Sequence, residues 1–114
     1  MESRKGRRFS CPMSLSAAVL LLSCVSALAL EPAAQRGQTF VRANCSQCHS
    51  IDKISASPLK IAPPFRTLHL QYPVENLAEA LAEGITTGHP SMPQFQLDAG
   101  QVGDVIAYLQ SLEH

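Results

Sequence analysis

Two cysteines and a histidine fall within five consecutive residues, Cys45-Ser46-Gln47-Cys48-His49, and this motif constrains the chain more than any other feature. The other two cysteines, Cys11 and Cys24, lie in an N-terminal segment that we expect to be removed. An exported domain of the remaining size, without a structural disulfide, has only a marginal core. A large buried cofactor would supply the missing cohesion.

The spacing of the motif is typical of covalent haem attachment. Two thiols three residues apart can add to the two vinyl groups on one edge of a porphyrin, while the adjacent histidine ligates the iron. A redox-active dithiol would need a βαβ context, which the sequence lacks. A zinc site would need a second ligand pair, whereas His69 and His89 are isolated from each other. We therefore predict one covalent haem c on Cys45 and Cys48, with His49 as an axial iron ligand.

The second axial ligand is predicted to be Met92, the one methionine outside the N-terminal segment. It lies in a loop between two prolines that stiffen the backbone. A thioether sulfur is a soft ligand that favours ferrous iron and raises the reduction potential. His69 and His89 are the rival ligands. A methionine that only fills a gap in the core is the structural alternative.

The first 29 residues have the pattern of a secretory signal peptide. Four basic residues precede an apolar run over 15–28 that is too short to span a bilayer comfortably, and Ala27-Leu28-Ala29 offers a cleavage site. We expect cleavage to leave residues 30–114 as one periplasmic haem domain in a bacterium, with no stable membrane insertion. Two alternatives stay open: a retained signal that tethers the chain to the membrane, and lipidation of Cys24.

Removal of the signal changes the charge balance. The whole chain carries nine basic and nine acidic side chains. Four of the basic ones and one acidic one lie in the signal, which leaves five against eight and a net charge of −3. No basic surface remains that could bind phosphates, so we expect no nucleic-acid partner.

The remaining domain has an all-α pattern, because no stretch shows sustained strand alternation. A first helix is expected over about Ala33–Ala43. A second follows Pro73 and ends at Gly84, which suits a helix C-terminus. A third begins after Asp98, which forms a capping-box pattern with Gln101.

Two connections without helical periodicity separate these helices, over residues 50–70 and 86–97. Prolines punctuate both segments. Loops of this length are uncommon in a small domain. Packing against a haem face would account for them.

Residues 34–112 resemble the small class I c-type cytochromes, the single-haem carriers of bacterial periplasms and mitochondria. In that family the Cys-x-x-Cys-His motif follows a first helix, and a methionine in a late loop completes the iron coordination. Cys45, Cys48, His49 and Met92 match these positions in order. The resemblance implies a cytochrome c-like fold, with three main helices and loops wrapped around one covalently bound haem.

The resemblance also implies roles for residues outside the motif. In the family, a glycine and an aromatic residue on the first helix cross an aromatic and aliphatic pair on the last, and a proline carbonyl orients the haem histidine. Further apolar residues line the haem crevice, although these could equally be ordinary core residues. The matching residues are Gly37 and Phe40 with Val105, Tyr108 and Leu109 for the crossing, Pro63 for the carbonyl, and Phe65, Leu68 and Phe95 for the crevice.

An iron with both axial positions filled has none open for a substrate, and the sequence shows no acid–base pair or nucleophile. These features predict an electron carrier, not an enzyme, with redox proteins as partners: an oxidoreductase, an oxidase or a cytochrome complex. One alternative is a haem subunit of a larger oxidoreductase, such as a periplasmic molybdenum-dependent dehydrogenase. Another is a five-coordinate haem that binds gas or peroxide, which requires that Met92 does not ligate.

Overall fold

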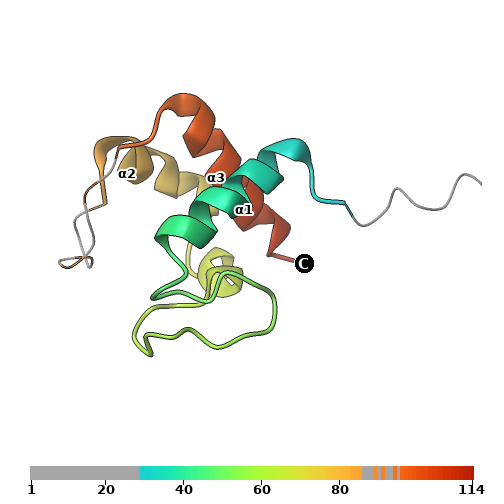
Figure 1. Ribbon diagram of the computed structural model, residues 1–114, viewed down its shortest axis with the longest axis vertical. Helices are drawn as coiled ribbons and strands as arrows, with labels where there is room; N and C mark the ends of the chain where they lie inside the picture. The colour runs from blue at the N-terminus through green and yellow to red at the C-terminus, as the bar shows by residue number, and fades with distance from the viewer. Residues whose placement is uncertain (1–28, 86–88, 90, 92–93, 95) are drawn as a thin grey trace, which may run out of the picture.

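The computed structural model describes residues 29–85, 89, 91, 94 and 96–114. Its secondary structure is helical, and the described residues contain no strand, so the all-α prediction is confirmed. Three α-helices pack together above a long loop, as Figure 1 shows. In chain order, the elements are α1 (Pro32–Asn44), the 3₁₀ helices η1 (Phe65–Leu70) and η2 (Val74–Asn76), α2 (Leu77–Glu83) and α3 (Ala99–Ser111).

The first and last helices, α1 and α3, cross at Gly37 (Figure 1). A Cβ atom added to Gly37 would lie 1.9 Å from the carbonyl oxygen of Asp104 and 2.9 Å from Cβ of Tyr108. Real side chains do not approach so closely, so only glycine allows the two backbones to meet here. Beyond the crossing, Val41 of α1 is completely buried among apolar residues that include Leu109 of α3.

Polar contacts of α3 accompany the crossing. The Arg36 guanidinium donates to both carboxylate oxygens of Asp104, over 2.8 and 2.7 Å. This pairing holds the pKa of Asp104 below its usual range, chiefly through the hydrogen bond. The Tyr108 hydroxyl donates to the carbonyl oxygen of Ile51 over 2.6 Å. This second contact joins α3 to the loop that follows the cysteine motif.

The expected ends of the second and third helices are confirmed. Asp98 and Gln101 form the predicted capping box: each side chain accepts a hydrogen bond from the other residue's backbone N–H, over 2.9 and 3.1 Å. Gly84 ends α2 with φ 104°, a left-handed conformation that favours glycine. The second predicted helix starts after Pro73 as a 3₁₀ turn and becomes α-helical at Leu77.

The expectation of a loop throughout residues 50–70 is wrong in its last third, where η1 forms. At the start of η1, the Pro64 carbonyl accepts hydrogen bonds from both the backbone N–H and the hydroxyl of Thr67. A single short 3₁₀ helix does not produce the 3.6-residue repeat by which α-helices are recognised.

The first part of this connection is held by side chains. The Asp52 carboxylate accepts hydrogen bonds from the backbone of Ile54 and Ser55 and from the Ser55 hydroxyl. Arg66 donates to the Ser55 carbonyl oxygen over 2.7 Å and to the hydroxyl of the buried Ser50 over 3.1 Å. The hydrogen bonds from Ser55 and Ile54 lower the pKa of the Asp52 carboxyl to about 2.

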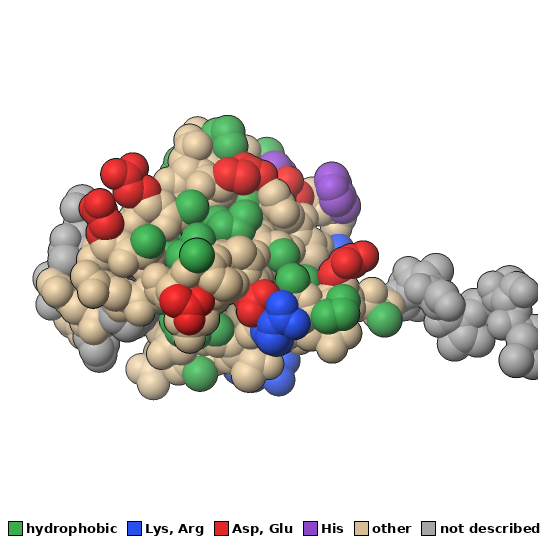
Figure 2. Space-filling model, turned by 90° about the horizontal axis from the view of Figure 1, so that it is seen from above, with side chains coloured by type: hydrophobic (Ala, Val, Ile, Leu, Met, Phe, Trp, Pro, Cys, Tyr) green, Lys and Arg blue, Asp and Glu red, His purple; other side chains and the backbone are tan. Residues whose placement is uncertain are grey.

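The predicted signal segment, including Cys24, lies outside the described residues except for Ala29. None of the helices described is both long and apolar enough to cross a membrane. Figure 2 shows acidic side chains spread over one face of the molecule, where fewer basic side chains are visible.

The crossing yields a matched pair of glycine substitutions. We expect Gly37→Ala to lower the free energy of unfolding by about 1–3 kcal/mol, because its methyl group would overlap the backbone of α3. Gly103→Ala is the control, since a Cβ there meets nothing within 4 Å and alanine favours the helix by about 0.5–1 kcal/mol. Urea unfolding followed by circular dichroism measures both. Equal effects of the two substitutions would contradict the close approach at Gly37.

Asp52 makes the loop sensitive to acid. The pKa of the Asp52 carboxyl is about 2 in the folded chain against an ordinary value of 3.8. The folded state therefore favours the ionised carboxylate. The resulting stabilisation is present above the ordinary value and is lost as the pH falls toward about 2. We therefore expect the stability difference between the parent chain and Asp52→Asn to be constant near neutral pH and to shrink below pH 4. Unfolding curves at several pH values measure it, and a pH-independent difference would contradict the assignment.

Candidate functional site

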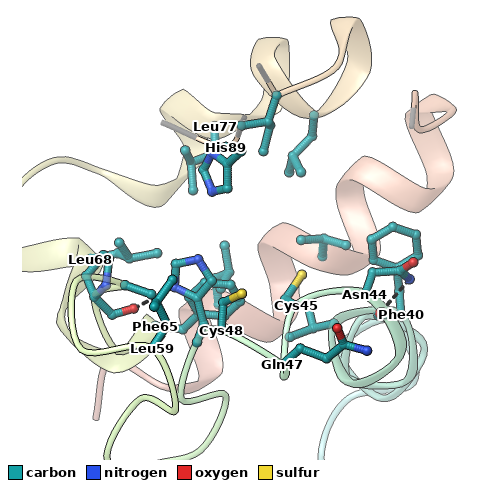
Figure 3. Close-up of a pocket in the computed structure, with 18 of the residues that line it drawn as sticks. Phe40, Asn44, Cys45, Gln47, Cys48, Leu59, Phe65, Leu68, Leu77 and His89 are labelled. Atoms are coloured by element: carbon teal, nitrogen blue, oxygen red, sulfur yellow. Dashed lines mark hydrogen bonds between the residues drawn. The ribbon is translucent and has the colours of Figure 1, made fainter. Parts of the chain in front are cut away.

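A cavity of ≈ 430 Å³ opens between the three α-helices and the loop that follows α1. This volume is ordinary for a site that binds a small molecule or cofactor. Its walls are mostly apolar, and the sulfur atoms of Cys45 and Cys48 lie at one side, opposite Leu77 and His89 (Figure 3). All three helices contribute to the walls: Phe40 and Val41 from α1, Leu77 and Leu81 from α2, and Val105 and Leu109 from α3.

The motif is placed at the cavity by the end of α1. The Cys45 N–H still bonds to the carbonyl oxygen of Val41 over 2.8 Å, as in the helix. The N–H groups of Cys48 and His49 then both donate to the Cys45 carbonyl oxygen, over 3.1 and 2.9 Å. This tight turn brings both thiols and the imidazole to the same cavity.

The two thiols differ in their surroundings. Cys45 is partly buried, whereas Cys48 is exposed at the rim. Burial raises the pKa of the Cys45 thiol to about 11, and the charge of Cys48 adds to the shift.

The His49 ring is fixed from two sides. Its Nδ1 lies 2.8 Å from the carbonyl oxygen of Pro63. Because a carbonyl only accepts, Nδ1 carries the proton in this bond, which leaves Nε2 with a lone pair. The ring also packs on Phe65, with centroids 4.6 Å apart. A hydrogen bond like the one to Pro63 orients an imidazole and raises its basicity as a metal ligand.

These residues fit haem c. Two thiols of one turn lie beside an imidazole whose Nε2 can donate to a metal, and the cavity around them is lined by apolar side chains. The fold therefore brings together Cys45, Cys48 and His49, the three residues that the sequence predicts to form one site.

Other predicted site residues are divided between the cavity and its surroundings. Phe65 and the buried Leu68 line the cavity, whereas Tyr108 is held at Ile51 and does not. Met92 and Phe95 lie outside the described residues.

The two rival histidines are in different places. His89 lines the cavity, but His69, in η1, does not. The His69 ring has a buried Nδ1 with no hydrogen-bond partner among the residues that the structure describes.

Several lining residues were missed from the sequence. Leu77, Leu81 and Ile85 recur at helical spacing, a signal that marks a buried face without saying what covers it. Leu59 and Ile61 gave no signal, because they stand in an aperiodic segment; Ile61 is 87% exposed although it lines the cavity.

Comparison with known proteins agrees with this geometry. Residues 34–113 match the family model of cytochrome c. Cytochrome c-552 of Bradyrhizobium diazoefficiens is 30% identical over 94 residues, which cover 82% of this chain and 88% of that protein. No match was found among solved structures.

The chain therefore belongs to the cytochrome c family, and the predictions of a small c-type cytochrome and of the all-α fold are confirmed. It carries one covalent haem c, for which Cys45 and Cys48 supply the attachment motif. Members of this family are electron carriers, not enzymes, and they exchange electrons with redox proteins.

Proposed function

We propose that this chain is a single-haem carrier that transfers one electron at a time, with His49 and Met92 as the axial ligands of the iron. The observation that carries the proposal is the His49 ring held by the Pro63 carbonyl at 2.8 Å, beside both cysteines of the motif. Bound haem supplies a one-electron couple between ferrous and ferric iron. The residues of the chain position that group and adjust its potential.

The assignment of Met92 is supported by the residues around it. Ser91, the preceding residue, lines the cavity, and so does His89. The far end of the same segment is attached to α2: the Leu97 N–H donates to the Leu81 carbonyl oxygen over 3.1 Å. Met92, the domain's one methionine, directly follows Ser91 in the sequence, which supports its assignment as the second ligand.

The two ligands would act in opposite directions on the potential. The hydrogen bond that His49 donates to the Pro63 carbonyl makes the imidazole a more basic ligand, which favours ferric iron. A thioether at Met92 favours ferrous iron. The apolar walls, which include Leu68 and Leu109, exclude water and disfavour the extra positive charge of the ferric state.

Electron exchange would take place where the cavity meets the surface. Cys48 and Ile61 both line the cavity, and both are exposed. A redox partner, such as an oxidoreductase, an oxidase or a cytochrome complex, can therefore approach this rim. The net charge of −3 for residues 30–114 argues against a nucleic-acid partner.

A second candidate is a haem subunit of a larger oxidoreductase, such as a molybdenum-dependent dehydrogenase. It is favoured by large apolar side chains that are exposed in the 50–70 connection. Ile54 is 90% exposed, Ile61 87% and Leu70 74%. Exposed apolar side chains, where they are contiguous, mark protein interfaces.

The proposed location is the bacterial periplasm, after removal of residues 1–29. Purification from the native source tests the location and the choice between the two candidates. We expect a free monomer whose mass corresponds to a chain that begins at Leu30 together with one haem. Co-elution with a dehydrogenase subunit would favour the second candidate, and a retained or lipidated N-terminus would contradict the soluble periplasmic form.

Substitution of the proposed thioether ligand tests the function directly. In Met92→Ala holoprotein we expect the weak far-red band of Met–iron coordination to disappear and the reduction potential to fall, because a ligand that favours ferrous iron is lost. Absorption spectra and redox titration measure these changes. Gln94→Ala is the control, since this exposed side chain of the same segment does not line the cavity. An unchanged spectrum and potential in Met92→Ala would contradict the ligand assignment.

A further inference from the structure

His89 is the second imidazole of the cavity, and it lies across from the first. The ring centroids of His49 and His89 are 6.1 Å apart, with 32° between the ring planes. Figure 3 shows His89 beside Leu77, with its ring directed into the cavity and with Cys48 on the other side. The cavity therefore has a nitrogen donor on each of two opposing sides.

The separation is that expected of two ligands on one metal. Metal–imidazole bonds are about 2 Å long and ring nitrogens lie about 1 Å from their centroids, so two imidazoles on opposite sides of a metal have centroids about 6 Å apart. The His49 Nδ1 is engaged by Pro63. Its Nε2 is thus the nitrogen that can donate to a metal in the cavity.

We propose that His89 binds the haem iron on the side opposite His49 when the Met92 thioether has left that position. The inference rests on the proposed function, in which His49 and Met92 hold the iron. Only one of Met92 and His89 can occupy the position at a time, so exchange breaks an iron–sulfur bond and forms an iron–nitrogen bond.

The exchange would follow the oxidation state. Sulfur, the softer donor, favours ferrous iron, whereas imidazole favours ferric iron more than a thioether does. Oxidation therefore lowers the preference of the iron for Met92 over His89 and reduction raises it, while Met92 remains the ligand in most of the ferric parent protein. The carrier would then have two potentials, a higher one with methionine bound and a lower one with histidine bound.

His69 provides the matched comparison. It is also a partly buried histidine, but it belongs to η1 and does not line the cavity. The inference assigns iron binding to His89 and not to His69.

The experiment compares three holoprotein variants: Met92→Ala, Met92→Ala with His89→Phe, and Met92→Ala with His69→Phe. The readouts are the ferric absorption and electron paramagnetic resonance spectra and the rate of carbon monoxide binding to the ferrous form. We expect Met92→Ala to stay low-spin, with a signature of two imidazoles, and the His69→Phe combination to match it. The His89→Phe combination should become high-spin and bind carbon monoxide rapidly, because no side chain then fills the position.

Added imidazole tests whether the His89→Phe combination retains an intact site. Return of the low-spin spectrum shows that the haem and His49 are still in place. A high-spin spectrum already in Met92→Ala would overturn the inference, and so would a low-spin spectrum that survives loss of both side chains.

Failure of the proposed function would look different. The parent protein would then lack the far-red band, and Met92→Ala would leave its spectrum unchanged. In that case the single variant His89→Phe decides the inference: conversion to high-spin supports His89 as an iron ligand, and an unchanged spectrum rejects it.

Discussion

The close approach of α1 and α3 at Gly37 is the constraint on which the rest of the structure depends. With no Cβ at this position, the backbones of the two helices meet, and the residues beyond it, Val41 and Leu109, become part of a shared apolar core. The same two residues line the cavity. The cysteine motif follows directly at the end of α1, so the crossing also determines where Cys45 enters the cavity.

The loop after the motif completes the site through polar contacts to helices and neighbouring turns. The Tyr108 hydroxyl donates to the Ile51 carbonyl, and Arg66 donates to Ser50 and Ser55. Nδ1 of His49 donates to the Pro63 carbonyl. A small domain with a single apolar core has little stability to spare. These bonds, together with a covalently attached cofactor, explain how an aperiodic connection keeps a defined shape.

The sequence was informative where a local signal exists. Three features are defined by residues that are neighbours in the sequence: the five-residue motif, the capping box at Asp98 and the C-terminal glycine of α2. The structure contains the capping box and the glycine where the sequence predicts them. The 3₁₀ helix η1 was missed because it has no α-helical repeat. The contacts of Arg36 with Asp104 and of Tyr108 with Ile51 join residues 68 and 57 positions apart, which no local pattern reveals. The position of His89 opposite His49 likewise depends on how the helices fold back.

Mass spectrometry of the purified holoprotein under denaturing conditions tests the central claim most directly. If Cys45 and Cys48 carry the haem through two thioether bonds, the mass of the unfolded polypeptide includes one haem, and extraction with acidified acetone does not remove it. Proteolysis should then place the added mass on the peptide that contains both cysteines. A polypeptide without added mass, or a haem that the solvent extracts, would contradict the account.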